Sequence, residues 1–236
     1  MSGEGNDNSI FTLMRLIPSG QEYIREVSYI ESFNGTHSEK QAIRLKQLFN
    51  DFEADYIALD CQGNGMAVFD ELVKVQYDQD RDEEYMAFTC FNDEKMAERC
   101  MSKNALPVIF SIKVVKLEVN HEIALSLKDA FQKKKIRLLI NDIEGKDFLI
   151  EKLGLLKKSP DEQARMLKPY LQTTAMVNET INLEYQILNG YVRIKEKGRN
   201  RKDRYSSISY GNYLAKILEK DLRREKKSKN NFISLW

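Results

Sequence analysis

Two stretches of β-branched and aromatic residues, 10–17 and 23–30, open the pattern of apolar positions along the chain. They flank a turn-forming Pro-Ser-Gly triplet at 18–20, so an antiparallel hairpin is predicted. Apolar residues then recur at helical spacing over 42–52, behind a Ser-x-x-Gln capping box that begins at Ser38. This pattern predicts an amphipathic helix of about four turns.

A short apolar run, 56–59, follows that helix and ends in Asp60. The glycines Gly63 and Gly65 come next, and helical spacing resumes over 69–73. We therefore predict a buried strand, a tight glycine-rich turn and a helix, in that order.

The remaining pattern predicts further elements of both kinds. Asn189-Gly190 between two β-prone runs is the strongest local signal, because this dipeptide favours a two-residue hairpin turn. Residues 78–84 are charged or amide-bearing without periodicity, which is typical of an exposed loop. The other predictions are strands over 108–115 and 136–140, and helices over 122–131, over 161–185 with an interruption at Pro169, and from 205 onward.

Strands that alternate with helices after an opening hairpin indicate an α/β protein with a mixed sheet covered by helices. The 236 residues, 42% of them hydrophobic, are enough for a substantial core. Since no composition shift marks a boundary, we expect one domain over 1–222, followed by a basic tail over 223–236.

Cysteine and histidine usage excludes several kinds of site. Three cysteines without a CxxC spacing and two histidines, His37 and His121, predict neither a disulfide framework nor a structural zinc site. No apolar stretch reaches membrane-spanning length and the N-terminus lacks signal-peptide features, so a cytoplasmic protein without a membrane partner is expected. A net charge of +1 gives no global signal for nucleic acid, so that argument depends on local clusters.

Asp60 is the first candidate for chemistry. A carboxylate at the carboxyl end of a buried strand lies where open α/β sheets place their ligand sites. Asp is also common in turns, and the structural alternative is that Asp60 caps the following helix or braces the glycine turn.

Asp203 is the second candidate, inside a basic segment just ahead of the last predicted helix. Its structural alternative is a helix N-cap or a first-turn acid. The surrounding cations could grip DNA phosphates or form a solvated hairpin tip. These candidate DNA-binding residues are Lys195, Lys197, Arg199, Arg201, Lys202 and Arg204.

Segments 52–65, 68–72 and 201–213 resemble the nuclease domain of the large terminase subunit of tailed bacteriophages. Segment 5–11 and the hairpin turn at 189–190 fall in the order that this family shows, so the resemblance extends over nearly the whole chain.

The resemblance implies an RNase H-like fold and a metal-dependent endonuclease that cuts concatemeric DNA during genome packaging. Asp60 and Asp203 correspond to the family's second and third acidic ligands, which would hold two Mg²⁺ or Mn²⁺ ions; such ions favour carboxylate oxygen. The implied partners are double-stranded DNA and, in a full-length protein, the small terminase subunit, the portal and an N-terminal ATPase domain.

The family's first metal-binding aspartate lies on an opening strand upstream of segment 5–11, where this chain offers only Glu4 and Asp7. We therefore expect a fragment, and whether the opening strand is missing stays open. A catalytically impaired DNA- or capsid-binding fragment is the alternative, and another RNase H-like enzyme, such as a resolvase, is a third hypothesis.

Overall fold

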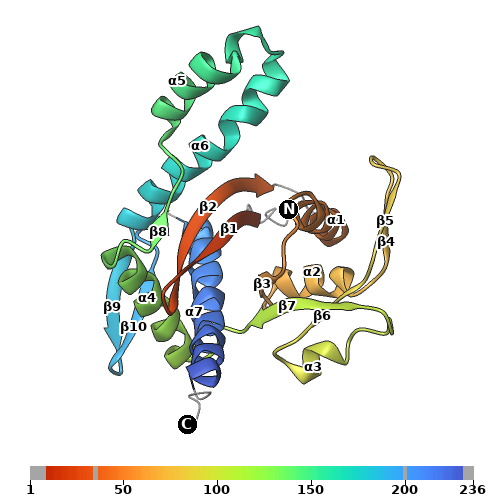
Figure 1. The fold of residues 1–236 in the computed structure, drawn as a ribbon, viewed down its shortest axis with the longest axis vertical. Coiled ribbons are helices and arrows are strands. Elements are labelled where there is room, and N and C mark those ends of the chain that lie inside the picture. The colour runs from red at the N-terminus through yellow and green to blue at the C-terminus, as the bar shows by residue number, and fades with distance from the viewer. Residues whose placement is uncertain (1–8, 34–36, 199–200, 231–236) are drawn as a thin grey trace, which may run out of the picture. The chain divides into compact units, whose positions relative to one another are not determined.

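The computed structural model describes residues 9–33, 37–198 and 201–230, with side chains as far as Arg223. It shows a mixed α/β protein whose strands form several small sheets instead of the one mixed sheet that the sequence predicts (Figure 1). The chain divides into two compact units. Unit 1 comprises Met1–Ser9 and Phe33–Val119, and unit 2 comprises Ile10–Ser32 and Asn120–Trp236.

Unit 1 is built on a parallel three-stranded sheet. Its strands are β3 (Ile57–Asp60), β7 (Leu106–Ile112) and β6 (Phe88–Cys90), in the order β3-β7-β6. Ile57 pairs with Ile109 and Asp60 with Ile112, so β3 and β7 end at the same edge. The predicted buried strand before the glycine turn is confirmed.

One face of this sheet packs against α1 (Ser38–Asp51) and α2 (Asn64–Leu72). Side chains that alternate along the strands face these helices, since Leu59 and Ile109 belong to the same apolar cluster as Phe69 and Leu72. The two helices predicted for this region are confirmed. The N-terminal signal of α1 was predicted wrongly, because Ser38 is already inside the helix and His37 occupies the N-cap position.

Residues 78–84 contribute to a hairpin, not to the unstructured loop that their composition predicts. The strands are β4 (Gln76–Asp78) and β5 (Glu83–Tyr85), paired antiparallel. Between them, the Arg81 guanidinium donates to both oxygens of Asp51 at 2.6 and 2.8 Å. The charges therefore anchor the hairpin to α1. After β6, unit 1 contains the short α3 (Glu94–Ala97).

The sheet of unit 2 contains the predicted opening hairpin, which is confirmed. β1 (Ser9–Ser19) and β2 (Glu22–Phe33) are joined by a two-residue turn in which Gly20 adopts φ +65°. β2 also pairs in parallel with β8 (Ile136–Arg137). The strand predicted over 136–140 is thus only two residues long.

Two helices complete the core of unit 2, α4 (Leu117–Gln132) and α7 (Asp203–Asn230). Leu127 of α4 and Ile208 of α7 pack with Val27 and Ile30 of β2 in one buried cluster. Both helices were predicted, but α4 begins earlier than expected, which places His121 inside the helix.

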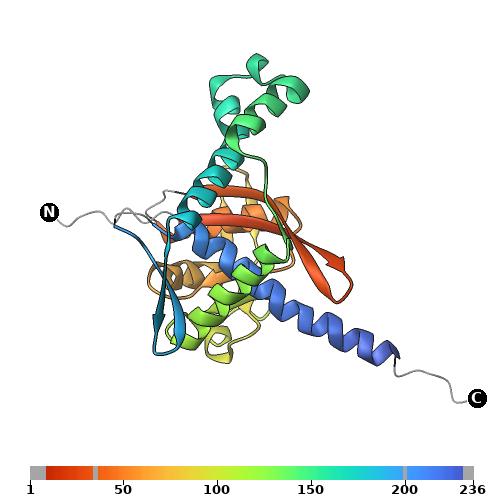
Figure 2. The ribbon, with the colours of Figure 1, turned by 90° about the vertical axis from the view of Figure 1, so that its left-hand side faces the viewer.

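A helical hairpin extends from this core (Figures 1 and 2). It consists of α5 (Asp142–Leu153), the 3₁₀ turn η1 (Leu155–Lys157) and α6 (Pro160–Ile181). Ser159 and Glu162 form a capping box at the start of α6. The interruption predicted at Pro169 is wrong, because α6 continues through it.

The predicted Asn-Gly hairpin follows α6 and is confirmed. β9 (Glu184–Leu188) and β10 (Tyr191–Lys195) pair antiparallel, and Asn189 and Gly190 both adopt positive φ, as a type I′ turn requires. Among the helices within the described ranges, none has the length and apolar character needed to cross a membrane.

Candidate functional site

Asp60 ends β3 at the carboxyl edge of the parallel sheet, and the chain turns there immediately into α2 (Figure 1). A Cβ atom at Gly65 would lie 1.7 Å from the carbonyl oxygen of Asp60. Only glycine permits so close an approach of helix to strand. Gly63, with φ +52°, makes the turn itself. The glycines that follow Asp60 therefore set its position at the sheet edge.

The Asp60 side chain is partly buried and takes part in this turn. Its Oδ1 atom accepts a hydrogen bond from the amide of Gln62 at 3.2 Å. The Gln62 side chain in turn accepts from the amide of Val114, just after β7, at 3.0 Å. Asp60 thus performs the turn-bracing role that the sequence offered as its structural alternative, while its carboxylate stays at the edge where α/β sheets bind ligands.

Three polar residues that the sequence reasoning missed share this edge. The Asn92 amide both accepts from the backbone amide of Ser111 at 2.7 Å and donates to its carbonyl at 2.9 Å. Lys113 pairs with Asp93 at 2.7 Å, and this hydrogen bond lowers the pKa of Asp93. The sequence pattern did not predict these residues because β6 has three residues, which is too few for a periodic pattern.

Asp203 is the first residue of α7 and lies in unit 2. A carboxylate in the first turn interacts favourably with the helix dipole, which is its structural alternative. The carboxylate is also 3.7 Å from the Arg201 guanidinium, and both side chains are about one-third exposed. Asp60 belongs to unit 1, so the two acidic candidates lie in different units.

The candidate DNA-binding residues differ in their surroundings. Lys197 is exposed, and Lys195, Arg201 and Lys202 are partly buried. Arg204 is 18% exposed and is engaged by α6, through Gln172 at 2.8 Å and Glu179 at 3.2 Å. Arg199 lies outside the described residues, as do Glu4 and Asp7.

The β9–β10 hairpin that leads into this basic segment is fixed to α4. The Nδ1 atom of His121 accepts a hydrogen bond from the Val192 amide at 2.9 Å, and the imidazole meets the Tyr191 ring edge-on. Lys128 of α4 lies over the Tyr185 ring, 5.6 Å from its centroid. These contacts give His121 a structural role.

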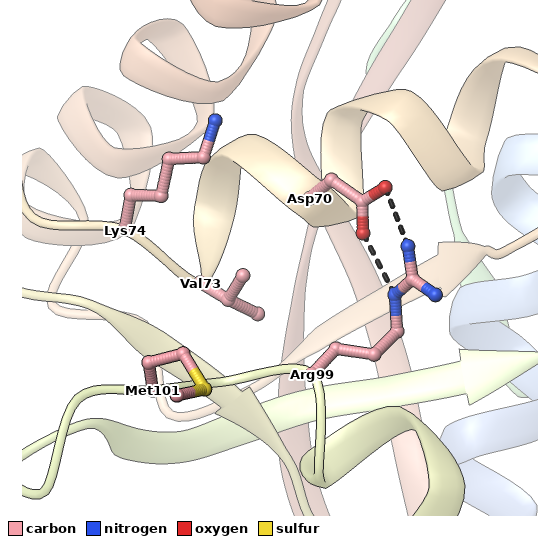
Figure 3. A pocket seen from close by; sticks show the side chains of 5 residues that line it. All are labelled: Asp70, Val73, Lys74, Arg99 and Met101. Atoms are coloured by element: carbon pink, nitrogen blue, oxygen red, sulfur yellow. Dashed lines mark hydrogen bonds and ion pairs between the residues drawn. The ribbon is translucent and has the colours of Figure 1, made fainter.

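A hollow on unit 1 lies at the end of α2 (Figure 3). Both oxygens of Asp70 bind the Arg99 guanidinium across it, at 2.8 and 2.7 Å. Val73, Lys74 and the highly exposed Met101 form the rest of its lining. Since Asp70 and Arg99 bind each other, this hollow offers no obvious chemistry.

The sequence predicts metal ligands at Asp60 and Asp203. Within the described residues, no group of three or more His, Cys, Asp and Glu side chains is arranged to hold a metal ion. Asp60 and Asp203 each offer carboxylate oxygens, which are the ligands that Mg²⁺ and Mn²⁺ prefer. Cys61 does not fit such an ion, because burial raises the pKa of its thiol to about 11.

Comparisons with known proteins return no match, neither to a family model, nor to a curated protein, nor to a solved structure. The sequence motifs and the surroundings of each carboxylate within its own unit are therefore the basis for a functional proposal.

Proposed function

We propose that this chain is a metal-dependent DNA endonuclease domain with an RNase H-like fold, of the kind found in the large terminase subunit of tailed bacteriophages. One observation carries the proposal: Asp60 terminates a parallel strand, and a glycine that no other residue could replace brings α2 directly behind it. This conformation supports the proposal, because open α/β sheets bind their ligands at the carboxyl ends of their strands.

Each residue has a role in this proposal. Asp60 and Asp203 would hold Mg²⁺ or Mn²⁺ through carboxylate oxygens. Bound divalent ions supply an activated water and stabilise the leaving oxygen of a phosphodiester. Arg201, 3.7 Å from Asp203, puts a positive charge beside that carboxylate. Lys195, Lys197 and Lys202 would contact DNA phosphates without reading sequence.

In the complete packaging machine, the same proposal gives double-stranded DNA as substrate, with the small subunit, portal and ATPase domain as partners. Arg204 is removed from the set of DNA-contacting residues in this proposal, because α6 already binds its guanidinium.

Nicking of supercoiled plasmid DNA in the presence of Mn²⁺ tests the proposal. We expect nicking that EDTA abolishes and that falls about a hundredfold or more in Asp60→Asn and in Asp203→Asn, since even outer partners of metal ligands cost about 10–100-fold. Asp70→Asn is the matched control, because that carboxylate binds Arg99.

Unchanged nicking by the Asp203→Asn variant would contradict the assignment of Asp203 as a metal ligand. Plasmid binding without nicking by the unaltered chain would instead support the catalytically impaired fragment. Cleavage confined to branched DNA would favour a resolvase-like enzyme.

A further inference from the structure

Asp203 is the first residue of α7, and a helix is least constrained at its ends. The first amides of a helix have no partners within it, and helix ends fray. A side chain that binds a metal must nevertheless be held to within about 0.5 Å. The start of α7 therefore needs support from outside the helix if Asp203 is a ligand.

Glu179, in the last turn of α6, supplies that support. One oxygen of its carboxylate accepts a hydrogen bond from the amide of Tyr205 at 2.8 Å. The other accepts from the guanidinium of Arg204 at 3.2 Å. The Glu179 side chain is 7% exposed. This buried carboxylate thus binds the two residues that directly follow Asp203, one through its backbone and one through its side chain.

Further contacts connect Glu179 and the start of α7 to the sheet of unit 2. Gln172 of α6 accepts from Arg204 at 2.8 Å and donates to the hydroxyl of Ser32, in β2, at 3.2 Å. One turn further along α7, the Ser207 hydroxyl bonds that of Thr12, in β1, at 2.8 Å. The first two turns of α7 are thereby fixed to α6, β2 and β1.

We propose that Glu179 is a positioning residue, which fixes the first turn of α7 so that Asp203 presents its carboxylate to a divalent ion. This inference rests on the function proposed above. It assigns Glu179 no contact with the metal or the DNA. Replacing Glu179 therefore loosens the first turn of α7 before any metal is added.

Glu219 provides a matched control on the same helix. It too is a buried carboxylate that binds an arginine and a backbone amide, Arg25 at 2.6 Å and Tyr23 at 2.9 Å. It lies 16 residues after Asp203, or about 24 Å along α7. A general loss of stability should follow from either replacement, but only Glu179 is next to the candidate ligand.

The experiment compares Glu179→Gln with Glu219→Gln in the full chain. Calorimetric titration gives the affinity for Mn²⁺, and hydrogen exchange without metal gives the protection of amides in segment 203–208. We expect Glu179→Gln to weaken Mn²⁺ binding about tenfold, the lower end of the range for outer partners of ligands. The same variant should exchange faster in that segment, and Glu219→Gln should change neither quantity.

Equal Mn²⁺ affinities in the two variants would overturn the positioning role. If Glu179→Gln fails to fold, Arg204→Gln removes the same ion pair from the other side and carries the same expectation. The Asp203→Asn variant separates the two proposals. Unchanged Mn²⁺ affinity in that variant would contradict the proposed function itself. Weakened Mn²⁺ affinity in Asp203→Asn, together with parent-like Mn²⁺ affinity in Glu179→Gln, would contradict the positioning role alone.

Discussion

At the scale of single residues, Lys46 is the most unusual side chain of unit 1. It is fully buried in α1, donates to the carbonyl of Lys74 just beyond the end of α2 at 2.6 Å, and lies over the Phe88 ring. Burial lowers its pKa to about 8, and Glu71 opposes this shift by stabilising the charge. The ammonium group closes the carbonyl end of α2, at the cost of losing its water.

This burial makes stability depend on pH. Between about pH 8 and 10.5 the unfolded chain keeps the Lys46 proton and the folded chain has released it. The unfolded state then binds more protons, so this group makes the free energy of unfolding rise with pH in that window. We expect Lys46→Met to lose that rise, as measured by urea unfolding at pH 7 and pH 9.5.

Lys40→Met, on the exposed side of the same helix, controls for the loss of a lysine. An identical change in unfolding free energy between the two pH values in the parent chain and in Lys46→Met would show that Lys46 does not titrate in this window.

Residue-level reasoning from sequence succeeds where the determinant is local. Asp60 at a strand end, the glycine turn and the Asn189-Gly190 turn are all encoded by neighbours in the chain. The capping box at Ser38 fails because Ser38 lies inside the helix, and the Gln41 side chain accepts a hydrogen bond from the hydroxyl of Ser9, 32 residues away. The sequence carries no signal for such a distant partner.

At the scale of elements, the sequence pattern predicted only one of the two helices of the α5–α6 hairpin. Helix α6 was predicted, but α5 was not, because Gly145 in its first turn weakens any helical pattern. The structure gives the reason for that glycine: a Cβ there would lie 2.4 Å from Cγ of Tyr170 in α6. The close contact between the helices, and not helix propensity, determines the residue.

Gly145→Ala should therefore destabilise the hairpin, although alanine favours helix. Overpacking costs about 1–3 kcal/mol, against roughly 1 kcal/mol gained in propensity. Thermal unfolding should show a lower midpoint for Gly145→Ala. In the background of Tyr170→Ala, which removes the obstructing ring, the same change should become neutral or stabilising. Destabilisation of equal size in both backgrounds would contradict this packing account.

Short strands explain the other missed elements. β4, β5 and β6 have three residues each, and Asp78 is buried in β4 because Gln47 of α1 donates to it at 2.6 Å. A charged loop becomes an ordered hairpin through partners on another helix. Periodicity, which needs longer runs, cannot reveal this.

At the scale of the whole molecule, the two units are discontinuous in sequence. The opening hairpin, 10–32, groups with the C-terminal half, and 1–9 together with 33–119 forms the other unit. Composition can mark a domain boundary only where a linker separates consecutive segments. It therefore gave no sign of two units whose segments alternate along the chain. The prediction of an α/β protein is confirmed, while the terminase resemblance stays a proposal about function.

Asp60 and Asp203 are the residues proposed to bind the divalent ions. Calorimetric titration with Mn²⁺ of the parent chain, of each Asp→Asn variant and of Asp70→Asn tests this proposal most directly. We predict saturable binding in the parent chain and in Asp70→Asn, and affinity at least about tenfold weaker in Asp60→Asn and in Asp203→Asn. Identical isotherms for all four proteins would contradict the proposal.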